Sequence, residues 1–293
     1  NQIKKELNNS RLNANLIFYD SNLDLINDKD FEGLVIDDNF YLSSNLEKKL
    51  KYKVSKSRFK VLSKLNWTLY ILQRIPNAVI NDNTTLKTIR KFELQKFELG
   101  IKRVGDIIFS GILILVTFPI VSLAILFIKL EDKGPIFYSQ IRTGFKSKKI
   151  RIWKLRTMYA NSEDGEAKWA IKNDKRITKI GKILRKTRID ELPQLFSIII
   201  GDMSLIGPRP ERPEFDAILE KEIPNYLLRY KIKPGLSGWA QVNYTYGSSI
   251  NDSEKKLSYD LFYLAQFSLW LDLLIFFKTI NLVLNGKGSE PKK

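Results

Sequence analysis

The sequence contains neither cysteine nor histidine. Their absence excludes disulfides, thiolate nucleophiles, Cys/His zinc sites and a histidine general base. Any catalysis must therefore use carboxylates, amines, hydroxyls or an oxygen-bound metal ion. The lack of cysteine fits a reducing compartment. We also find no G-x-G-x-x-G dinucleotide fingerprint, no internal repeat, no low-complexity tract and no signal peptide of the usual kind at the start.

Acidic residues are few beside the basic ones: the chain has 32 Asp and Glu against 49 Lys and Arg, a formal charge of +17. Such a charge implies an anionic partner, which could be nucleic acid, an acidic membrane surface or a phosphate-rich substrate. Charge alone does not choose among these three. With 293 residues, the chain can form one large domain or two modest ones.

One long stretch, Ile107–Ile128, is almost free of charge. As a straight helix it would be ~33 Å long, enough to cross a bilayer. Pro119 lies in its middle and predicts a kink. Cations such as Lys102 and Lys129 flank both ends, so the positive-inside rule gives no orientation. We predict a membrane helix over residues 104–130 with a kink at Pro119.

An acidic pair, Asp190 and Glu191, stands just ahead of Pro193. Proline is common at the first helical position, so the pair is predicted at a helix N-terminus. Downstream, the stiff bend 207–210 (GPRP) would hold the guanidinium of Arg209 in a fixed direction. Together these features indicate a phosphate site with a divalent metal. The alternative is that the acids only complement the helix dipole.

Four further cations are candidates for holding phosphate oxygens. Lys154 and Arg156 lie in the segment WKLRTM, Arg142 lies in GPIFYSQIRTG, and Arg188 precedes the acidic pair. Arginine offers a planar fork to an oxyanion and lysine offers a point charge. In a chain this basic, each of them could instead be a solvated surface charge.

The two ends of the chain give weaker patterns. Residues 1–95 are interpreted as a small α/β piece, with short strands in 15–20 and 32–38 and a mostly helical stretch over 46–73. The last helix is predicted over 253–284. Charges such as Asp272 disfavour a second membrane span there and favour a helix lying in the interface.

Six segments in series carry a resemblance. KRVGDIIFSG, GPIFYSQIRTG, WKLRTM, DELPQL, GDMSLIGPRP and KPGLSGWAQVNY resemble, in this order, the bacterial sugar transferase family, the monotopic phosphoglycosyl transferases. The resemblance covers Phe97 to Gly286. Several motifs in series are far more specific than any one alone.

The resemblance implies an α+β fold: a mostly helical, membrane-associated catalytic domain over residues 96–293, with a hydrophobic helix that is re-entrant or spanning. In the family this helix breaks near a proline, often after serine, whereas here Phe118 precedes Pro119. Residues 1–95 resemble part of a Rossmann-like accessory domain.

The resemblance also implies a reaction. Asp190 would be the nucleophile, Glu191 a ligand of Mg²⁺, and Arg209 a contact to a substrate phosphate, with Lys154, Arg156, Arg188 and Arg142 as further phosphate contacts. A nucleotide diphosphosugar, by the family's habit a UDP-hexose, would pass its sugar phosphate through an aspartyl intermediate to polyprenyl (undecaprenyl) phosphate. Neither step removes a proton from the nucleophile, so a histidine base is not needed.

The products would be UMP and a polyprenyl diphosphate sugar, which begins an exopolysaccharide, capsule or O-antigen repeat. The expected location is the bacterial inner (cytoplasmic) membrane, with the catalytic face in the cytoplasm. We expect no nucleic-acid partner, because nucleic-acid binding would explain the charge but not the apolar helix. A non-catalytic basic membrane scaffold is the other alternative. The sugar, the polyprenol length and self-association stay open.

Overall fold

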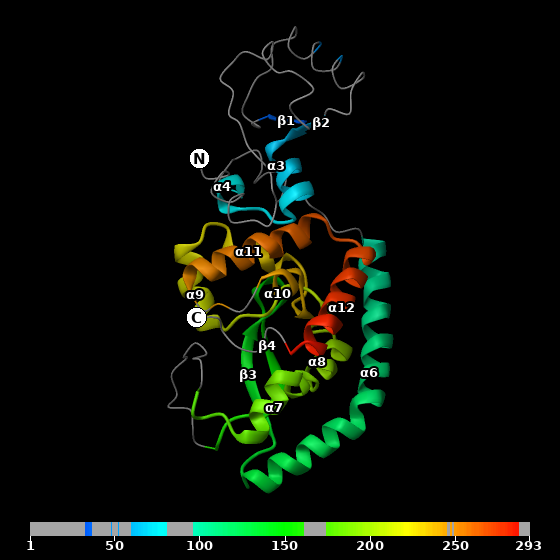
Figure 1. Cartoon of the computed structure of the whole chain (residues 1–293), viewed down its shortest axis with the longest axis vertical. Helices are drawn as coiled ribbons and strands as arrows, with labels where there is room; N and C mark the ends of the chain where they lie inside the picture. The colour runs from blue at the N-terminus through cyan, green and yellow to red at the C-terminus, as the bar shows by residue number, and fades with distance from the viewer. Residues whose placement is uncertain are drawn as a thin grey trace. The chain divides into compact units, whose positions relative to one another are not determined.

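The computed structural model describes residues 33–36, 48, 52, 60–80, 96–160, 174–244, 247 and 249–286. The chain divides into two compact units, 1–92 and 93–293. Figure 1 labels the longer helices and the strands β1 to β4.

The first unit contains a pair of parallel strands, β1 (Gly33–Ile36) and β2 (Lys60–Ser63). The chain continues through three short helices, α3 (Lys64–Trp67), the π-helix η2 (Thr68–Leu72) and α4 (Asn77–Ile80). The strand expected within 32–38 is confirmed, and the one expected in 15–20 lies outside the described residues.

The helix expected over 46–73 is wrong at 60–63. There Val61 and Leu62 pair with Leu34 and Val35, and Leu62 and Val35 then pack against the apolar cluster of Trp67. Parallel pairing joins segments far apart in the chain, which local periodicity does not report. The Rossmann-like identity of this unit stays a prediction.

The second unit begins with a long helix and a hairpin and continues with short helices around two small sheets. Its elements are α6 (Lys96–Glu131), β3 (Phe137–Thr143), η3 (Phe145–Ser147), β4 (Lys149–Leu155), α7 (Lys179–Thr187), η4 (Ile189–Glu191), α8 (Gln194–Ile200), β5 (Ser204–Ile206), α9 (Pro213–Glu222), η5 (Tyr226–Lys231), β6 (Gly235–Ser237), α10 (Trp239–Asn243), α11 (Ile250–Ala265) and α12 (Leu269–Leu284). Strands β3 and β4 are antiparallel, and β5 and β6 are parallel. The expected α+β class, mostly helical, is confirmed for this unit.

Helix α6 contains the predicted apolar stretch and Pro119. Its segment Phe97–Glu131 is, within the described residues, the one helix long and apolar enough to cross a membrane. Figure 1 shows α6 running beside α12 and α8 and then bending toward the end of the β3–β4 hairpin. Proline breaks the backbone hydrogen-bond ladder and is the usual cause of such a bend.

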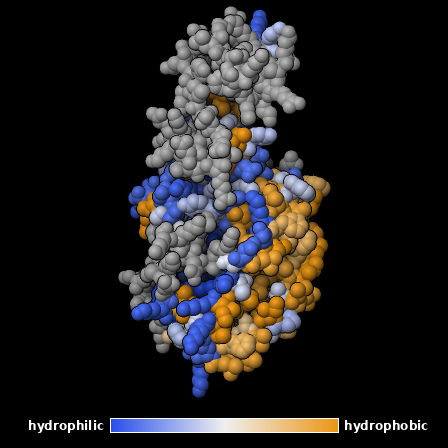
Figure 2. Space-filling model, viewed as in Figure 1, coloured by the Kyte–Doolittle hydropathy of each residue, from blue (hydrophilic) through white to orange (hydrophobic). Residues whose placement is uncertain are grey.

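An apolar surface covers one side of this unit, and we call it the apolar face. It is formed by exposed side chains of α6 together with α8 and α12: Phe97, Ile101, Val104, Ile107, Ile108, Phe109, Ile112, Leu115, Val116, Phe118, Ile120, Leu123, Leu126, Phe127, Leu130, Phe196, Ile200, Trp270, Leu273, Leu274, Phe277, Ile280 and Leu284. Figure 2 shows this concentration on the side where α6 and α12 lie. A patch of this extent is typical of a membrane or protein contact.

The predicted single helix over 253–284 is wrong, because the chain breaks between α11 and α12. Ser268 begins α12 by accepting a hydrogen bond from the backbone N–H of Leu271 at 3.2 Å. The break separates two environments: α11 buries Leu261 and Tyr263, whereas α12 exposes Trp270. One straight helix could not serve both.

The hairpin strand β4 connects the core to the site. Ile150 and Ile152 are buried in one cluster with Leu195 and Ile198 of α8. Side chains two apart on a strand share a face. Lys154 therefore projects to the same side as these two isoleucines, but one position further along, where the apolar cluster ends.

Candidate active site

The acidic pair lies in the short 3₁₀ turn η4, between α7 and α8. Arg188 ends α7 in the left-handed conformation, with φ of 61°. Pro193 is the N-cap of α8 and not its first helical residue. Asp190 and Glu191 thus precede α8, as expected, and the predicted start of the helix is corrected by one residue, from Pro193 to Gln194. The left-handed residue redirects the chain and turns both carboxylates inward, where each is only 6% exposed.

Glu191 is surrounded by three cations. Its Oε1 lies 2.8 Å from Nζ of Lys154 and 2.5 Å from Nη2 of Arg209, and its Oε2 lies 3.6 Å from Nη1 of Arg188. Burial acts to raise the pKa of this carboxyl, but the three cations outweigh burial and hold its pKa well below the usual range. Glu191 is therefore ionised at any physiological pH.

Asp190 is in a different state. Its Oδ1 is buried and has no hydrogen-bond partner. Burial, followed by the charge of Glu191, raises its pKa to about 6, against the opposing attraction of Lys154 and Arg188. The pair thus has one carboxylate fixed among cations and one that is less stabilised and free at one oxygen. This separation of environments suits two different chemical roles.

The cations leave the site positively charged. Lys154, Arg188 and Arg209 against two ionised carboxylates give a net charge of +1. Burial lowers the pKa of Lys154, and Glu191 opposes that effect. Arg188 and Arg209 are about a third exposed, at 31% and 34%. An anion arriving from solvent can therefore reach both guanidinium groups.

The bend that carries Arg209 is held by hydrogen bonds of its backbone, beginning with Gly207 N, which donates to Ser237 O at 2.8 Å. Pro208 O accepts from Gly235 N at 2.9 Å, and Arg209 O accepts from Arg229 Nη2 at 2.9 Å. Gly207 lies so close to the β6 segment that an added Cβ would be 2.4 Å from Lys233 O. Only glycine allows this approach, so the predicted stiff bend is also anchored to the sheet.

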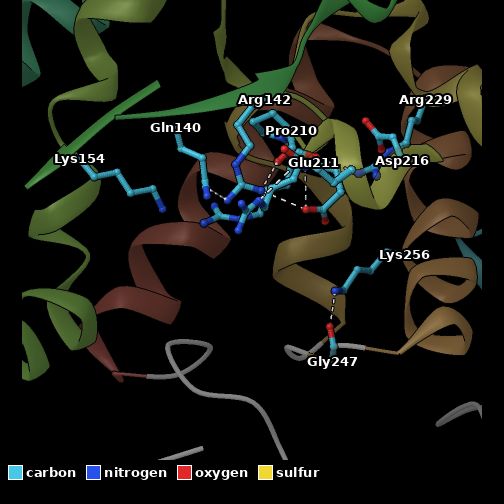
Figure 3. Close-up of polar contacts among 12 residues, drawn as sticks. Gln140, Arg142, Lys154, Pro210, Glu211, Asp216, Arg229, Gly247 and Lys256 are labelled. Carbon is cyan, nitrogen blue, oxygen red and sulfur yellow. Dashed lines mark hydrogen bonds and ion pairs between the residues drawn. The ribbon is translucent and has the colours of Figure 1, made fainter. Parts of the chain in front are cut away.

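Arg142 lies at the edge of the site. It donates to Glu211 Oε1 at 3.0 Å, to Gln140 Oε1 at 2.5 Å and, at 3.4 Å, to Pro210 O (Figure 3). Its charge also acts on Lys154, lowering the pKa of that amine further. Arg142 thus adjoins the bend that carries Arg209.

Arg156 points elsewhere. Its guanidinium donates to Asp132 O at 2.7 Å and lies 3.3 Å from Asp132 Oδ2. It is 7% exposed and holds the turn after α6. The structure brings Lys154, Arg188 and Arg209 together with the acidic pair, with Arg142 beside them, and it does not bring Arg156 to them. The proposed phosphate contact of Arg156 therefore lacks geometric support, because the strand's alternation ends at Leu155.

A buried cluster behind Arg209 was not anticipated from the sequence. Arg229 pairs with Asp260, and Tyr230 donates to Asp216 Oδ1 at 2.6 Å. Arg229 precedes the KPGLSGWAQVNY segment but falls outside every motif. The one sequence feature that could have pointed to Arg229 is its charge at an otherwise apolar position of a helical pattern.

No three acidic side chains converge on a metal position within the described parts of the chain. Mg²⁺ is, however, usually held by one or two carboxylates together with substrate phosphates. Glu191 is one such carboxylate, although its oxygens also lie near Lys154, Arg209 and Arg188. The donor set therefore fits a magnesium ion that arrives with a phosphate-bearing substrate.

This arrangement suits chemistry on phosphate groups beside an apolar surface, and the comparisons agree. The family model for bacterial sugar transferase matches residues 97–286. The chain is 46% identical over 190 residues to a UDP-N-acetylgalactosamine-undecaprenyl-phosphate N-acetylgalactosaminephosphotransferase of Aeromonas hydrophila, covering 65% of this chain and 45% of that protein.

Two further relatives are similar. A UDP-glucose:undecaprenyl-phosphate glucose-1-phosphate transferase of Klebsiella pneumoniae is 40% identical over 189 residues, which is 64% of this chain and 41% of that protein. The exopolysaccharide production protein PSS of Rhizobium leguminosarum bv. phaseoli is 37% identical over 199 residues, which is 65% of this chain and 99% of that protein.

The chain belongs to the bacterial sugar transferase family. The match includes the whole candidate site and α6. The chain spans less than half of the length of the Aeromonas and Klebsiella relatives.

Proposed function

We propose that the chain is a phosphoglycosyl transferase that moves a sugar phosphate from a nucleotide diphosphosugar, in the UDP-hexose class, to polyprenyl phosphate. The observation that carries this proposal is the difference in environment between the two carboxyl groups of the acidic pair. Asp190 has a free buried oxygen and a raised pKa, while Glu191 is fixed among three cations. The Aeromonas and Klebsiella relatives are named as transferases that use UDP-sugars and undecaprenyl phosphate, which supports the same reaction.

In the first step, the carboxylate of Asp190 attacks the phosphorus that bears the sugar. A bond forms between this oxygen and phosphorus, and the bond from phosphorus to the bridging diphosphate oxygen breaks. UMP leaves with that oxygen and its electron pair. Arg209, Arg188 and Lys154 would contact the diphosphate oxygens and offset their growing charge.

In the second step, an oxygen of the polyprenyl phosphate attacks the phosphorus of the aspartyl intermediate. The bond to Asp190 breaks and the free carboxylate returns. Both nucleophiles are already anions at neutral pH, so no general base is needed. One role of Glu191 is to keep the cations in place, close to the reacting phosphorus.

A magnesium ion would be held by Glu191 together with oxygens of the donor. When bound, it would supply positive charge that stabilises the departing diphosphate oxygen. The attack itself is assigned to Asp190.

We further propose that α6 enters the cytoplasmic leaflet of the inner membrane and returns, with the site at the cytoplasmic face. Near the start of α6, Lys102 Nζ lies 2.6 Å from Asp272 of α12. At its end, Glu131 accepts from the backbone N–H groups of Lys179 and Ile180, at 2.8 and 3.1 Å. Both ends thus contact one folded unit. A spanning helix would separate its two ends by the bilayer, so these contacts support a bent, re-entrant helix at Pro119.

The test measures release of UMP by protein in lipid nanodiscs with polyprenyl phosphate and Mg²⁺. The donors are UDP-glucose, UDP-galactose, UDP-N-acetylglucosamine and UDP-N-acetylgalactosamine. We expect release by the wild type that requires the lipid and is lost in Asp190→Asn. The matched control is Asp202→Asn, an exposed aspartate outside the site, which should keep the wild-type rate. Full activity of Asp190→Asn would contradict the nucleophile, and no release from any donor would favour the scaffold alternative.

A further inference from the structure

A second buried charge pair lies behind the bend that carries Arg209. Arg229 of η5 and Asp260 of α11 are joined at 2.8 Å, and their side chains are only 7% and 2% exposed. The guanidinium also lies 5.2 and 5.6 Å from the ring centroids of Tyr226 and Tyr230. It donates to the hydroxyl of Tyr226 at 2.5 Å. The proposed chemistry uses none of these groups.

Arg229 connects this pair to the active site through the main chain. Its Nη2 donates to the carbonyl of Arg209 at 2.9 Å. The side chain of Arg209 in turn reaches Glu191 at 2.5 Å. Figure 3 shows Arg229 on the far side of the Pro210 segment from Lys154. One guanidinium thus fixes the backbone position from which the other extends.

The bend depends on such donors because it has few of its own. Pro208 and Pro210 have no N–H groups, so this stretch is held mainly through its carbonyls. Pro208 O is held by Gly235 N at 2.9 Å and Pro210 O only at 3.4 Å by Arg142. Of the two side-chain donors to this bend, Arg229 makes the shorter hydrogen bond, to Arg209 O at 2.9 Å. It sets the orientation of the peptide unit that follows Arg209.

A buried ion pair is a poor source of stability, since the cost of removing two charges from water can exceed their attraction. A pair of apolar residues could have filled the same volume. A role in geometry accounts for the pair better. Asp260 offsets the charge of Arg229, which leaves the guanidinium free to hold a carbonyl and a phenol at once.

We propose that Arg229, held by Asp260, is a positioning residue that aims the guanidinium of Arg209 at the substrate phosphate. The inference rests on the proposed function, in which Arg209 contacts that phosphate. Arg229 itself would touch no substrate. Its effect on the rate should therefore pass entirely through Arg209.

A double-mutant cycle tests this dependence. Arg229→Lys keeps the charge beside Asp260 but loses the planar fork that reaches several partners at once. With Arg209 present, we expect kcat/KM for the donor to fall about 10- to 100-fold, the effect of a small misplacement. In the Arg209→Ala background, the same change should cost less than about twofold. An equal loss in both backgrounds would overturn the proposal.

Two controls keep the cycle decisive. Arg151→Lys makes the same substitution at an exposed position of β4 and should leave kcat/KM unchanged. If Arg229→Lys does not fold, as judged by its melting transition, Asp260→Asn replaces it, with the same non-additive pattern expected. Failure of the proposed function looks different, because the wild type itself would then release no UMP. An active wild type with additive variants refutes the role of Arg229 alone.

Discussion

Replacing Asp190 with asparagine should abolish turnover and yet stabilise the folded protein at neutral pH. Burial raises the pKa of this carboxyl from 3.8 to about 6. The fold therefore prefers the protonated form, and ionising the group costs folding free energy. A neutral amide of nearly the same shape avoids that cost.

The size and sign of the effect follow from the pKa. A tenfold change in the acid dissociation constant corresponds to about 1.4 kcal/mol, so Asp190 costs on the order of 3 kcal/mol when fully ionised. Below about pH 4 the carboxyl is protonated in both folded and unfolded chains, and the two proteins should be equally stable. The wild type should lose stability relative to Asp190→Asn as the pH rises from about 4 to about 6. Above that range, the difference should stay constant.

The assay is a melting curve in detergent micelles at several pH values between 4.5 and 8. For a folded unit of this size, a difference of about 3 kcal/mol corresponds to a Tm higher by roughly 6–12 °C for the variant at pH 8. Asp202→Asn, at an exposed site, should show no such pH-dependent gap. A gap that is the same at every pH, or a variant less stable than the wild type at pH 8, would refute this reasoning.

Further predictions concern activity, the bend and the membrane helix. The kcat/KM of the wild type should fall about tenfold per pH unit below about pH 6, where Asp190 becomes protonated. Glu191→Gln should move the midpoint of this pH profile to a lower pH, because the charge of Glu191 raises the pKa of Asp190. Gly207→Ala should cost about 1–3 kcal/mol in a melting assay and slow UMP release, since its Cβ would lie 2.4 Å from a backbone oxygen. Because the chain has no cysteine, the variants Gly100→Cys and Lys133→Cys each carry a single site for thiol labelling. In oriented vesicles, a membrane-impermeant maleimide should label both positions from the same side of the membrane. Labelling from opposite sides would contradict the re-entrant helix.

Local signals predicted the parts of the site that depend on local sequence. The acidic pair before Pro193, the rigid GPRP bend and the apolar run around Pro119 each have a short-range cause. Lys154 was suggested by the resemblance at WKLRTM, and the structure places it beside Glu191. The structure places Lys154 and Arg209 against Glu191 of the acidic pair, which lies in a 3₁₀ turn ahead of α8.

Other features depend on contacts between distant segments. Lys154 and Arg156 looked equivalent in the sequence, but the end of β4 sends Arg156 to Asp132. The pairing of Arg229 with Asp260 joins two helices that carry no shared motif. The break before α12 separates a helix with many buried side chains from one with an exposed apolar side, a difference that a continuous apolar pattern does not reveal.

The most direct test of the central claim is to trap the covalent intermediate. Protein in nanodiscs would be mixed with UDP-[³²P-β]-sugar and Mg²⁺ without the lipid acceptor, quenched, digested and analysed by mass spectrometry. We predict a phosphosugar on the peptide that carries Asp190, lost on addition of polyprenyl phosphate with formation of the labelled lipid product. If UMP is released at the wild-type rate with the acceptor, and no label is found on this peptide at any time, transfer does not pass through Asp190.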